Sequence, residues 1–335
     1  MPVEQDALVQ VRTPTYKRPG ALRRALRSLQ AQTWRNWVCD VYDDDPEGSA
    51  RAVCEEIGDP RIFYNHNTRQ KYASRNIDQC FSRDNPRKAD YFCVVEDDNY
   101  ILPEFMQRNI ETCRRLGVRL MLRNQYVEFM SGTPEARLSD FGIFDDMFVE
   151  RMYEPEEFRL SLIPGIGVSN GAMFWSKDVV SELEIGFPCT ATLQEYMRTF
   201  SIAEPLYVAR EPLAVWAQNG EQTTRDLGGG ASWLKRELDL KRAIQILQRE
   251  AWTMAGEKRG DFLRSELFTY PPRLRAVGLV KALIPARIGG VLNAREKIEL
   301  AGRGLLIRSA GRVTDDFHAF LSSRKSAAAR VGSSR

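Results

Sequence analysis

The chain has 335 residues, of which 43% are hydrophobic, which is enough to bury the core of a soluble globular protein. Its formal net charge of +3 is unevenly spread: residues 261–335 hold 14 Lys and Arg against six Asp and Glu, so the rest of the chain has a net charge of −5. With two histidines, a His-based triad or zinc site is nearly excluded, and acid–base chemistry falls to carboxylates.

The compartment is indicated by what the sequence lacks. The N-terminus has no basic region followed by an apolar stretch, and no apolar run reaches the roughly 18 residues that cross a bilayer. The six cysteines form no C-x-x-C pair, which indicates buried, reduced thiols. We therefore expect a cytoplasmic protein, with the inner face of the cell membrane as the alternative location.

The first 130 residues alternate between apolar strands and helix-period segments, which is typical of a parallel sheet covered by helices. The strands are expected at residues 7–11, 37–42, 61–64, 91–95 and 118–129, and the helices after Pro19, from Gly48, near Ala73 and at Pro103. The sequence therefore predicts an α/β fold with a doubly wound, mostly parallel sheet whose first half is Rossmann-like. Ligands of such sheets gather beyond the carboxyl ends of the strands.

The second half of the chain is less regular. After residue 131 the sequence is rich in loops, and the triple glycine 228–230 is the best candidate for a domain boundary. The predicted organisation is a catalytic domain over residues 1–227, a helical C-terminal region over 228–322 and a disordered basic tail over 323–335.

A basic, apolar segment lies inside that C-terminal region. Residues 271–292 alternate apolar side chains with Arg273, Arg275, Lys281 and Arg287. Such a segment fits a membrane interface near anionic lipid, but an ordinary packing or self-association helix explains it as well. Because base-stacking aromatics are not interleaved with the basic residues, we expect no nucleic-acid partner.

Acidic clusters follow two of the expected strands. Residues 96–98 (Glu-Asp-Asp) come directly after strand 91–95, and residues 43–45 (three Asp) follow strand 37–42. Hard divalent cations such as Mn²⁺ and Mg²⁺ take carboxylate oxygens as ligands and bridge them to phosphates. The alternatives are a solvated acidic turn ahead of a helix for the first cluster, and helix capping or turn formation for the second.

An aromatic residue follows a third strand. The first strand continues into Thr13-Pro14-Thr15-Tyr16, so a ring and a hydroxyl are expected at the same sheet edge as the acidic clusters. A flat nucleobase can stack on such a ring, and Tyr16 as an ordinary core residue is the alternative. Three strand ends therefore carry groups suited to a nucleotide and a cation.

Five motifs occur in order at these strand ends and helix starts. They are Arg12-Thr13-Pro14-Thr15-Tyr16-Lys17-Arg18-Pro19, Ser28-Leu29-Gln30-Ala31-Gln32-Thr33, Asp43-Asp44, Ser74-Arg75-Asn76 and Glu96-Asp97-Asp98-Asn99. Over residues 7–224 the pattern closely resembles the family-two glycosyltransferases, which have the GT-A fold. The Asp-Asp-Asn form of the last motif, followed by Tyr, Ile and Pro, is similar to the inverting enzymes of polysaccharide and spore-coat synthesis.

The resemblance implies roles for individual residues. Tyr16 would stack on the base, Asp44 would bond to the base edge with support from Asp43, and Asp97 would bind the ribose. Asp98 would be the main protein ligand of Mn²⁺ or Mg²⁺. The residues that the resemblance assigns to shaping the nucleotide pocket are Pro14, Thr15, Arg75 and Asn76.

An inverting transfer also needs a base that takes the proton from the acceptor hydroxyl. Family members usually place an acidic pair at the start of a late helix, and this chain has Gln194-Glu195 at that position, so the resemblance implies Glu195 as the catalytic carboxylate. A charged residue on the first turn of a helix is the alternative. The segment Asn170, Gly171 and Ala172 resembles the acceptor-side strand, although a tight turn would explain it too.

The sequence thus predicts a metal-dependent, inverting hexosyltransferase that moves a sugar from a UDP- or dTDP-sugar to a hydroxyl on a glycan, a lipid-linked intermediate or a small metabolite. A nucleotidyltransferase is the first alternative, but it would need a Gly-rich first loop, where this chain offers only Gly20. A catalytically inactive sugar-nucleotide-binding protein is the second. The donor sugar, the acceptor, the oligomeric state and the pathway stay open.

Overall fold

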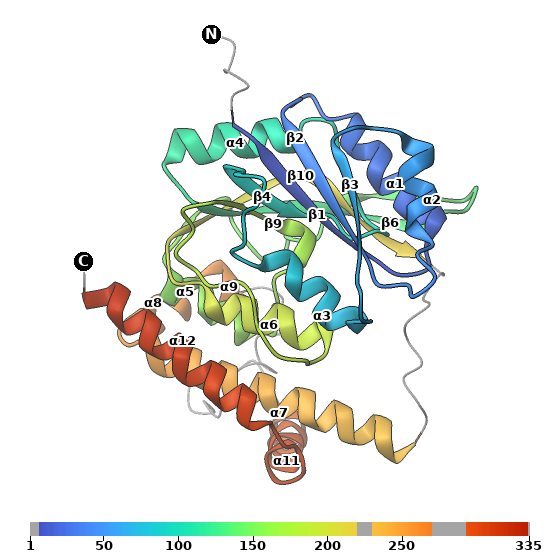
Figure 1. Ribbon diagram of the computed structural model, residues 1–335. Coiled ribbons are helices and arrows are strands. Elements are labelled where there is room, and N and C mark those ends of the chain that lie inside the picture. Colours follow the sequence, from blue (N-terminus) through green and yellow to red (C-terminus); the bar gives the residue numbers. More distant parts are fainter. Residues whose placement is uncertain (1–6, 220–229, 270–292, 334–335) are drawn as a thin grey trace.

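One mixed sheet organises the residues that the structure, a computed structural model, describes, namely 7–219, 230–269 and 293–333 (Figure 1). Ten strands within these ranges follow the order β3-β2-β1-β4-β9-β6-β10-β5, with β7 beside β6 and β8 beside β10. Their bounds are β1 Val9–Thr15, β2 Trp37–Asp43, β3 Ile62–His66, β4 Tyr91–Val94, β5 Tyr100–Ile101, β6 Leu120–Ser131, β7 Arg137–Gly142, β8 Arg151–Tyr153, β9 Met173–Ser176 and β10 Leu206–Asn219.

The two halves of the sheet differ in strand direction. β1 runs parallel to β2 and β4, and β2 runs parallel to β3. β9 then runs antiparallel to both β4 and β6, while β6 and β10 are parallel to each other. The predicted α/β fold and its Rossmann-like first half are confirmed. The sheet as a whole is mixed, because β5, β7, β8 and β9 are short antiparallel additions that need no helical crossover.

Helices cover both faces of this sheet and extend beyond one end (Figure 1). Their bounds are α1 Pro19–Gln30, α2 Ala50–Ile57, α3 Tyr72–Asp78, α4 Phe105–Leu116, α5 Pro155–Arg159, α6 Ala191–Ser201, α7 Ala231–Met254, α8 Lys258–Phe262, α9 Glu266–Thr269, α11 Ala294–Ala310 and α12 Asp315–Ser333. Short 3₁₀ turns lie at Gln79–Phe81, Leu160–Leu162 and Asn170–Ala172.

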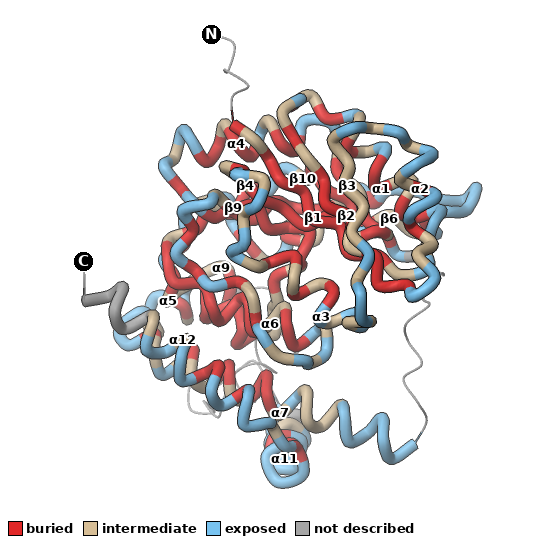
Figure 2. Tube along the Cα trace, viewed as in Figure 1, coloured by how far each residue is buried: buried red, intermediate tan, exposed pale blue. Residues whose placement is uncertain are grey.

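The strands feed two separate hydrophobic clusters because side chains alternate across a sheet. In β4, Phe92 and Val94 pack into one cluster, whereas Cys93 packs into the other, against α1, α2 and α4. α1 shows how the sequence selects this arrangement. Pro19 stands in its first turn, and the apolar face with Leu22 is buried against the sheet. Figure 2 shows the buried residues concentrated in the sheet and in the helices that cover it.

A third hydrophobic cluster joins the C-terminal helices to α6. Leu193 and Met197 of α6 pack with Leu247 of α7 and Phe317 of α12. The domain boundary expected at residue 227 falls among residues 220–229, which lie outside the described part of the chain, so it stays a prediction. The helices that follow nevertheless share a core with the helix that carries Glu195.

The C-terminal tail differs from the expectation. Residues 323–333 were predicted to be disordered, but they continue α12. Three successive alanines favour a helix there, and Arg324 fixes it to the body. The Arg324 guanidinium pairs with Glu182, donates to Ser201 Oγ at 3.2 Å and donates to the Glu184 carbonyl at 2.8 Å.

The predicted membrane-interface segment, residues 271–292, lies outside the described residues. Among the residues that are described, no helix is long and apolar enough to cross a bilayer. The six cysteines are all free thiols, and burial raises the pKa of Cys54 to about 11.

We expect the substitution Leu247→Ala to destabilise the whole protein by about 2–5 kcal/mol, because it leaves a cavity between α7 and α6. Urea unfolding followed by circular dichroism measures the change. Leu306→Ala on α11 is the control, since Leu306 is 55% exposed. Equal unfolding midpoints for the two variants would contradict a shared core.

Candidate active site

The acidic turn after β4 is joined to the loop after β1. Thr15 Oγ1 donates to Asp97 Oδ2 at 2.8 Å, and the Tyr16 backbone N–H donates to the same oxygen at 3.4 Å. Since β1 and β4 are parallel neighbours, their carboxyl ends meet at one edge of the sheet. The structure thus brings together two of the motifs that the sequence placed at strand ends.

The positively charged side chain of Arg18 lies between Asp97 and Asp98, the carboxylates that the resemblance assigns to the ribose and to the metal. Arg18, at the start of α1, has its Nη1 atom 3.3 Å from Asp97 Oδ1 and in an ion pair with Asp98 Oδ2. Burial raises the pKa of Asp97 to about 7, with the Asp98 charge adding to the effect and Arg18 opposing it. The two carboxylates therefore create a place that favours positive charge.

The donor set at this place is suited to a hard divalent cation. Asp97 and Asp98 offer only oxygen ligands, and the Arg18 guanidinium stands where positive charge is required. The described residues contain no group of three or more His, Cys, Asp or Glu side chains that could hold a metal by themselves. A cation here would therefore take further ligands from a diphosphate or from water.

The other side of the acidic turn is held by a polar network. Glu96 Oε2 accepts from Asn99 Nδ2 at 2.9 Å, and its Oε1 accepts from Asn170 Nδ2 at 3.3 Å. Asn170 Oδ1 in turn accepts from Arg198 Nη1 at 2.7 Å, and Arg198 Nη2 pairs with Asp78 at 2.8 Å. Asn170 therefore connects the acidic turn to α6 and α3.

Glu195 lies next to this network on the second turn of α6. Thr190 caps the start of the helix, because its Oγ1 accepts a hydrogen bond from the Leu193 N–H. Burial raises the pKa of Glu195 to about 8, with the charge of Glu96 adding to the effect and Arg198 opposing it. A half-buried carboxyl under the influence of Glu96 is not a solvated surface group, which weakens the alternative explanation of Glu195.

Gln194, the neighbour that replaces the family's usual acid, has a packing role. Its side chain is fully buried, and Nε2 donates to the Ser74 carbonyl at 2.9 Å. The bond fixes α6 against α3. Gln194 therefore holds α6 in place and adds no charge beside that of Glu195.

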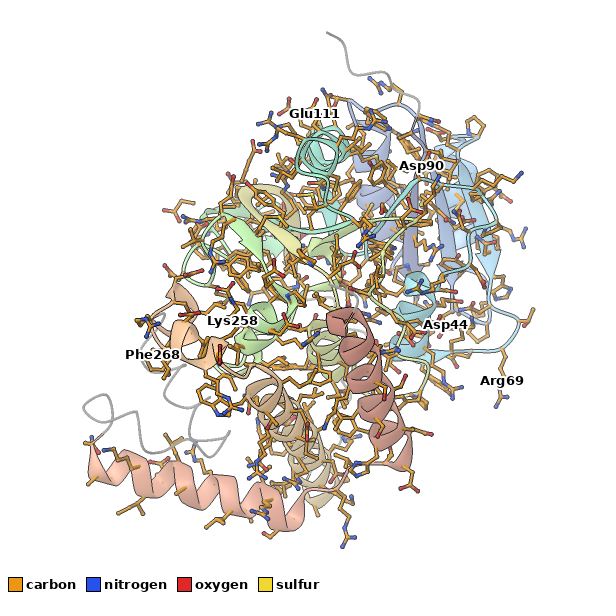
Figure 3. All side chains as sticks on the ribbon, turned by 90° about the vertical axis from the view of Figure 1, so that its left-hand side faces the viewer. Asp44, Arg69, Asp90, Glu111, Lys258 and Phe268 are labelled. Carbon is orange, nitrogen blue, oxygen red and sulfur yellow. The ribbon has the colours of Figure 1, made fainter. Side chains whose placement is uncertain are left out.

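The nucleotide side is arranged around α3. Asp44 accepts from the backbone N–H groups of Lys71 and Tyr72 at 2.6 and 2.7 Å and from Asn67 Nδ2 at 2.8 Å. Figure 3 shows Asp44 close to α3, while Arg69 points away from the body. The Asp44 carboxylate thus holds the loop before α3, and its bond to a base edge stays a prediction.

Two neighbours of Asp44 also organise the backbone. Asp43 accepts from the Ala50 N–H at 3.0 Å and from the Tyr64 hydroxyl at 3.2 Å, so it shapes the start of α2. Asn76 Nδ2 donates to the carbonyls of Thr15 and Tyr42, both at 3.2 Å. The ends of β1 and β2 are therefore fixed to α3.

The remaining predicted nucleotide residues lie around the same edge. Pro14 is the sixth residue of β1, and the Tyr16 ring is partly exposed with Lys17 Nζ 5.7 Å from its centre. Arg75 is exposed and lines a hollow of about 340 Å³ together with Arg69 and Lys71. Tyr16 is thus accessible to a ligand, whereas Arg75 faces a hollow that Asp78 and Glu184 also line.

The acceptor-side segment forms a buried turn ahead of β9. A Cβ at Gly171 would lie 3.1 Å from Gln125 Nε2, so the close packing of Gln125 explains the small residue. Ala172 is fully buried. Both amide atoms of Gln125 are buried without a hydrogen-bond partner in the described structure. Contact of this segment with a sugar acceptor stays a prediction.

Sequence reasoning missed several residues of the site. It assigned no role to Arg18 or Glu96, although both stand inside the quoted motifs. It missed Arg198 and Asp78, which are far apart in the chain and pair only in the folded protein. The one local signal was the position of Arg198, three residues after Glu195, which puts both on one side of α6.

The sheet with its carboxylate edge agrees with one class of protein, the glycosyltransferases, and the comparison with known families gives the same class. Residues 11–183, more than half of the chain, match the family described as Glycosyl transferase family 2. The chain belongs to this family. No curated protein sequence matches the chain.

Solved structures support the same fold. TarS 1–349 of S. aureus in complex with UDP has a TM-score of 0.56 at 13% identity, covering 95% of this chain and 91% of that one. The complex of TarS 1–349 with UDP-GlcNAc has a TM-score of 0.53 at 12% identity, covering 97% and 90%. A longer TarS structure has a TM-score of 0.53 at 13% identity. The match covers 94% of this chain but only 55% of that longer protein. At these identities the likeness establishes the GT-A fold.

We expect Arg198→Met to lower the free energy of unfolding by about 3–5 kcal/mol, because it leaves the buried Asp78 carboxylate without its cation. Chemical denaturation at neutral pH measures the loss. Arg23→Met removes an exposed ion pair with Glu56 and serves as the control. A loss no larger than that of Arg23→Met would contradict a structural role for the Arg198 network.

Proposed function

We propose that the chain is an inverting glycosyltransferase that moves a sugar from a UDP- or dTDP-sugar to a hydroxyl on a glycan, a lipid-linked intermediate or a small metabolite. One observation carries the proposal: hydrogen bonds run from Glu96 of the acidic turn through Asn170 to Arg198 of α6, the helix that also carries Glu195. In this proposal, a cation site and a base flank one position, as a single displacement requires.

The donor side is proposed at the ends of β1, β2 and β4. Tyr16 stacks on the base, Asp97 binds the ribose, and Asp98 holds Mn²⁺ or Mg²⁺ beside the diphosphate. When bound, the cation neutralises charge on the departing diphosphate. Arg18 provides a second positive charge at the same edge. The pocket is completed by Pro14, Thr15, Asp43, Asp44, Arg75 and Asn76.

The acceptor side is proposed between Asn170–Ala172 and α6. In its charged form, Glu195 takes the proton from the acceptor hydroxyl while that oxygen attacks the anomeric carbon, and the configuration inverts. A pKa of about 8 makes Glu195 a stronger base than an ordinary carboxylate and still leaves part of it charged near neutral pH. Asn170 holds Glu96 in place by a hydrogen bond, and the charge of Glu96 acts on Glu195.

The alternatives are weaker. A nucleotidyltransferase does not agree with membership of glycosyltransferase family 2. An inactive binding protein would not need a half-buried carboxyl with a raised pKa at the base position. Because TarS was solved with UDP and with UDP-GlcNAc, uridine donors are the first to test. Hydrolysis of a UDP-sugar with and without Mn²⁺ separates an active enzyme from a binding protein.

We expect Glu195→Gln to abolish sugar transfer while donor binding is retained, because the amide cannot accept the proton. For the wild-type protein, kcat/KM should rise with pH toward about 8 as Glu195 loses its proton. The assay is transfer measured across pH, with calorimetry for donor binding. Glu55→Gln on the exposed surface of α2 is the control, and a transfer rate equal to that control would contradict the assignment.

Thermal stability gives the same variant a second readout. A carboxyl whose folded pKa is raised stabilises the fold fully below its ordinary value of 4.5 and loses that contribution as the pH rises through about 8. Glu195→Gln resembles the protonated form at every pH. Its melting temperature should therefore exceed that of the wild type increasingly from about pH 4.5 to about pH 8, and the difference should level off above that pH. A constant difference would mean that Glu195 has an ordinary pKa.

We expect Asp98→Ala to abolish metal-dependent turnover and to weaken binding of the nucleoside diphosphate in the presence of Mn²⁺, because the main protein ligand is lost. Calorimetry with UDP, with and without Mn²⁺, measures the effect. Asp178→Ala, an exposed position after β9, is the control. Donor affinity unchanged from that control would rule out Asp98 as the metal ligand.

A further inference from the structure

Three arginines from two C-terminal helices lie together away from the acidic turn. Arg242 and Arg249 stand on α7, and Arg308 stands on α11, which lies against α7 (Figure 1). The two helices approach closely. Gln245 Nε2 donates to the Gly304 carbonyl at 3.2 Å, and a Cβ at Gly311 would lie 2.7 Å from Arg242 Cβ. This close packing brings Arg308 next to the two arginines of α7.

The cluster, defined as Arg242, Arg249 and Arg308, has no acidic partner in the described part of the chain. Arg242 Nη1 donates to the Gln245 side-chain oxygen at 2.7 Å, which is a neutral acceptor. Arg249 Nε and Nη2 are buried, and neither has a hydrogen-bond partner within the described structure. Two donors of one guanidinium therefore lack an acceptor.

The described carboxylates on these helices pair with other cations. Glu250 pairs with Lys325, Glu299 with Arg303, Asp239 with Lys235 and Glu237 with Lys241. Within the described side chains, the arginine cluster thus has no carboxylate that balances its charge.

This arrangement is unfavourable unless an anion joins it. Burial lowers the pKa of Arg249, and the charges of Arg308 and Arg242 lower it further. Burial and the charge of Arg308 act on Arg242 in the same way. Leaving buried guanidinium donors unpaired costs free energy, whereas a phosphate group can accept several such bonds at once.

We infer that Arg242, Arg249 and Arg308 form a second anion site, which binds a phosphate group separately from the sugar donor. The free Arg249 donors and the three converging charges suit the oxygens of a phosphate ester. A soluble phosphate and a lipid headgroup share this chemistry. A lipid headgroup is tested in a separate experiment, because α11 also exposes the apolar side chains of Ile298 (75%) and Leu305 (62%). The inference does not depend on the proposed function.

The first experiment uses inorganic phosphate and the full-length protein in EDTA. The test variant is Arg242→Gln/Arg249→Gln/Arg308→Gln, and the control is Arg303→Gln, an exposed arginine of α11 paired with Glu299. Calorimetry should show phosphate binding to the wild type and the control, and about tenfold or more weaker binding to the triple variant. Any phosphate that binds at the donor site contributes equally to all three proteins.

The second experiment uses flotation with vesicles of phosphatidylglycerol or phosphatidylcholine. If the site takes a lipid headgroup, the wild type and the control float with phosphatidylglycerol only, and the triple variant does not float. If the site takes a soluble phosphate, calorimetry detects binding without flotation. The inference is wrong if the wild type responds in neither experiment or if the triple variant responds as the wild type does.

A folding measurement separates an anion site from a structural role. In phosphate-free buffer, Arg249→Gln should leave the melting temperature unchanged or raise it, since it removes a half-buried guanidinium whose Nε and Nη2 atoms have no partner among the described residues. A lower melting temperature would mean that Arg249 stabilises the fold by itself and would overturn the inference. Transfer to a soluble acceptor should be unchanged in the triple variant, so this test and that of the proposed function can fail independently.

Discussion

The crowding of Glu96, Asp97 and Asp98 at the end of β4 is the constraint on which the rest of the site depends. Like charges packed together in a partly buried turn repel each other, and burial raises the pKa of Glu96 to about 7. The fold compensates on two sides: Arg18 lies against the two aspartates, and Asn170 donates to Glu96. The same contacts of Arg18 and Asn170 keep the three carboxylates together, as binding of a cation requires.

The acidic turn also connects the two halves of the proposed reaction. Its donor side is fixed by hydrogen bonds to the loop after β1, and its acceptor side is fixed through Asn170 and Arg198 to α6. Because Glu195 stands on α6, one network sets the positions of the proposed base and of the proposed cation site. A change in Arg198 would therefore affect both the stability of the fold and the geometry of catalysis.

The C-terminal helices contribute to this geometry from the other side of α6. Leu247 of α7 and Phe317 of α12 complete the core against which α6 packs. The arginine cluster proposed to bind phosphate lies on α11 and on α7, and α7 is one of the helices that support α6. An enzyme that acts on lipid-linked or phosphorylated acceptors would gain from such a site, because it would hold the acceptor or the membrane against the protein.

The sequence by itself determined the strands and helices of the first 130 residues, the sheet edge and the family, because apolar periodicity and strand-end motifs are local. It also led to the prediction that Asp97, Asp98 and Glu195 belong to one site. Only the tertiary structure decided which partners they have. Arg18 reaches Asp98 across 80 residues, Arg198 reaches Asp78 across 120, and Arg324 holds the last helix to Glu184 across 140. No local pattern specifies such pairs, because packing alone brings these segments together.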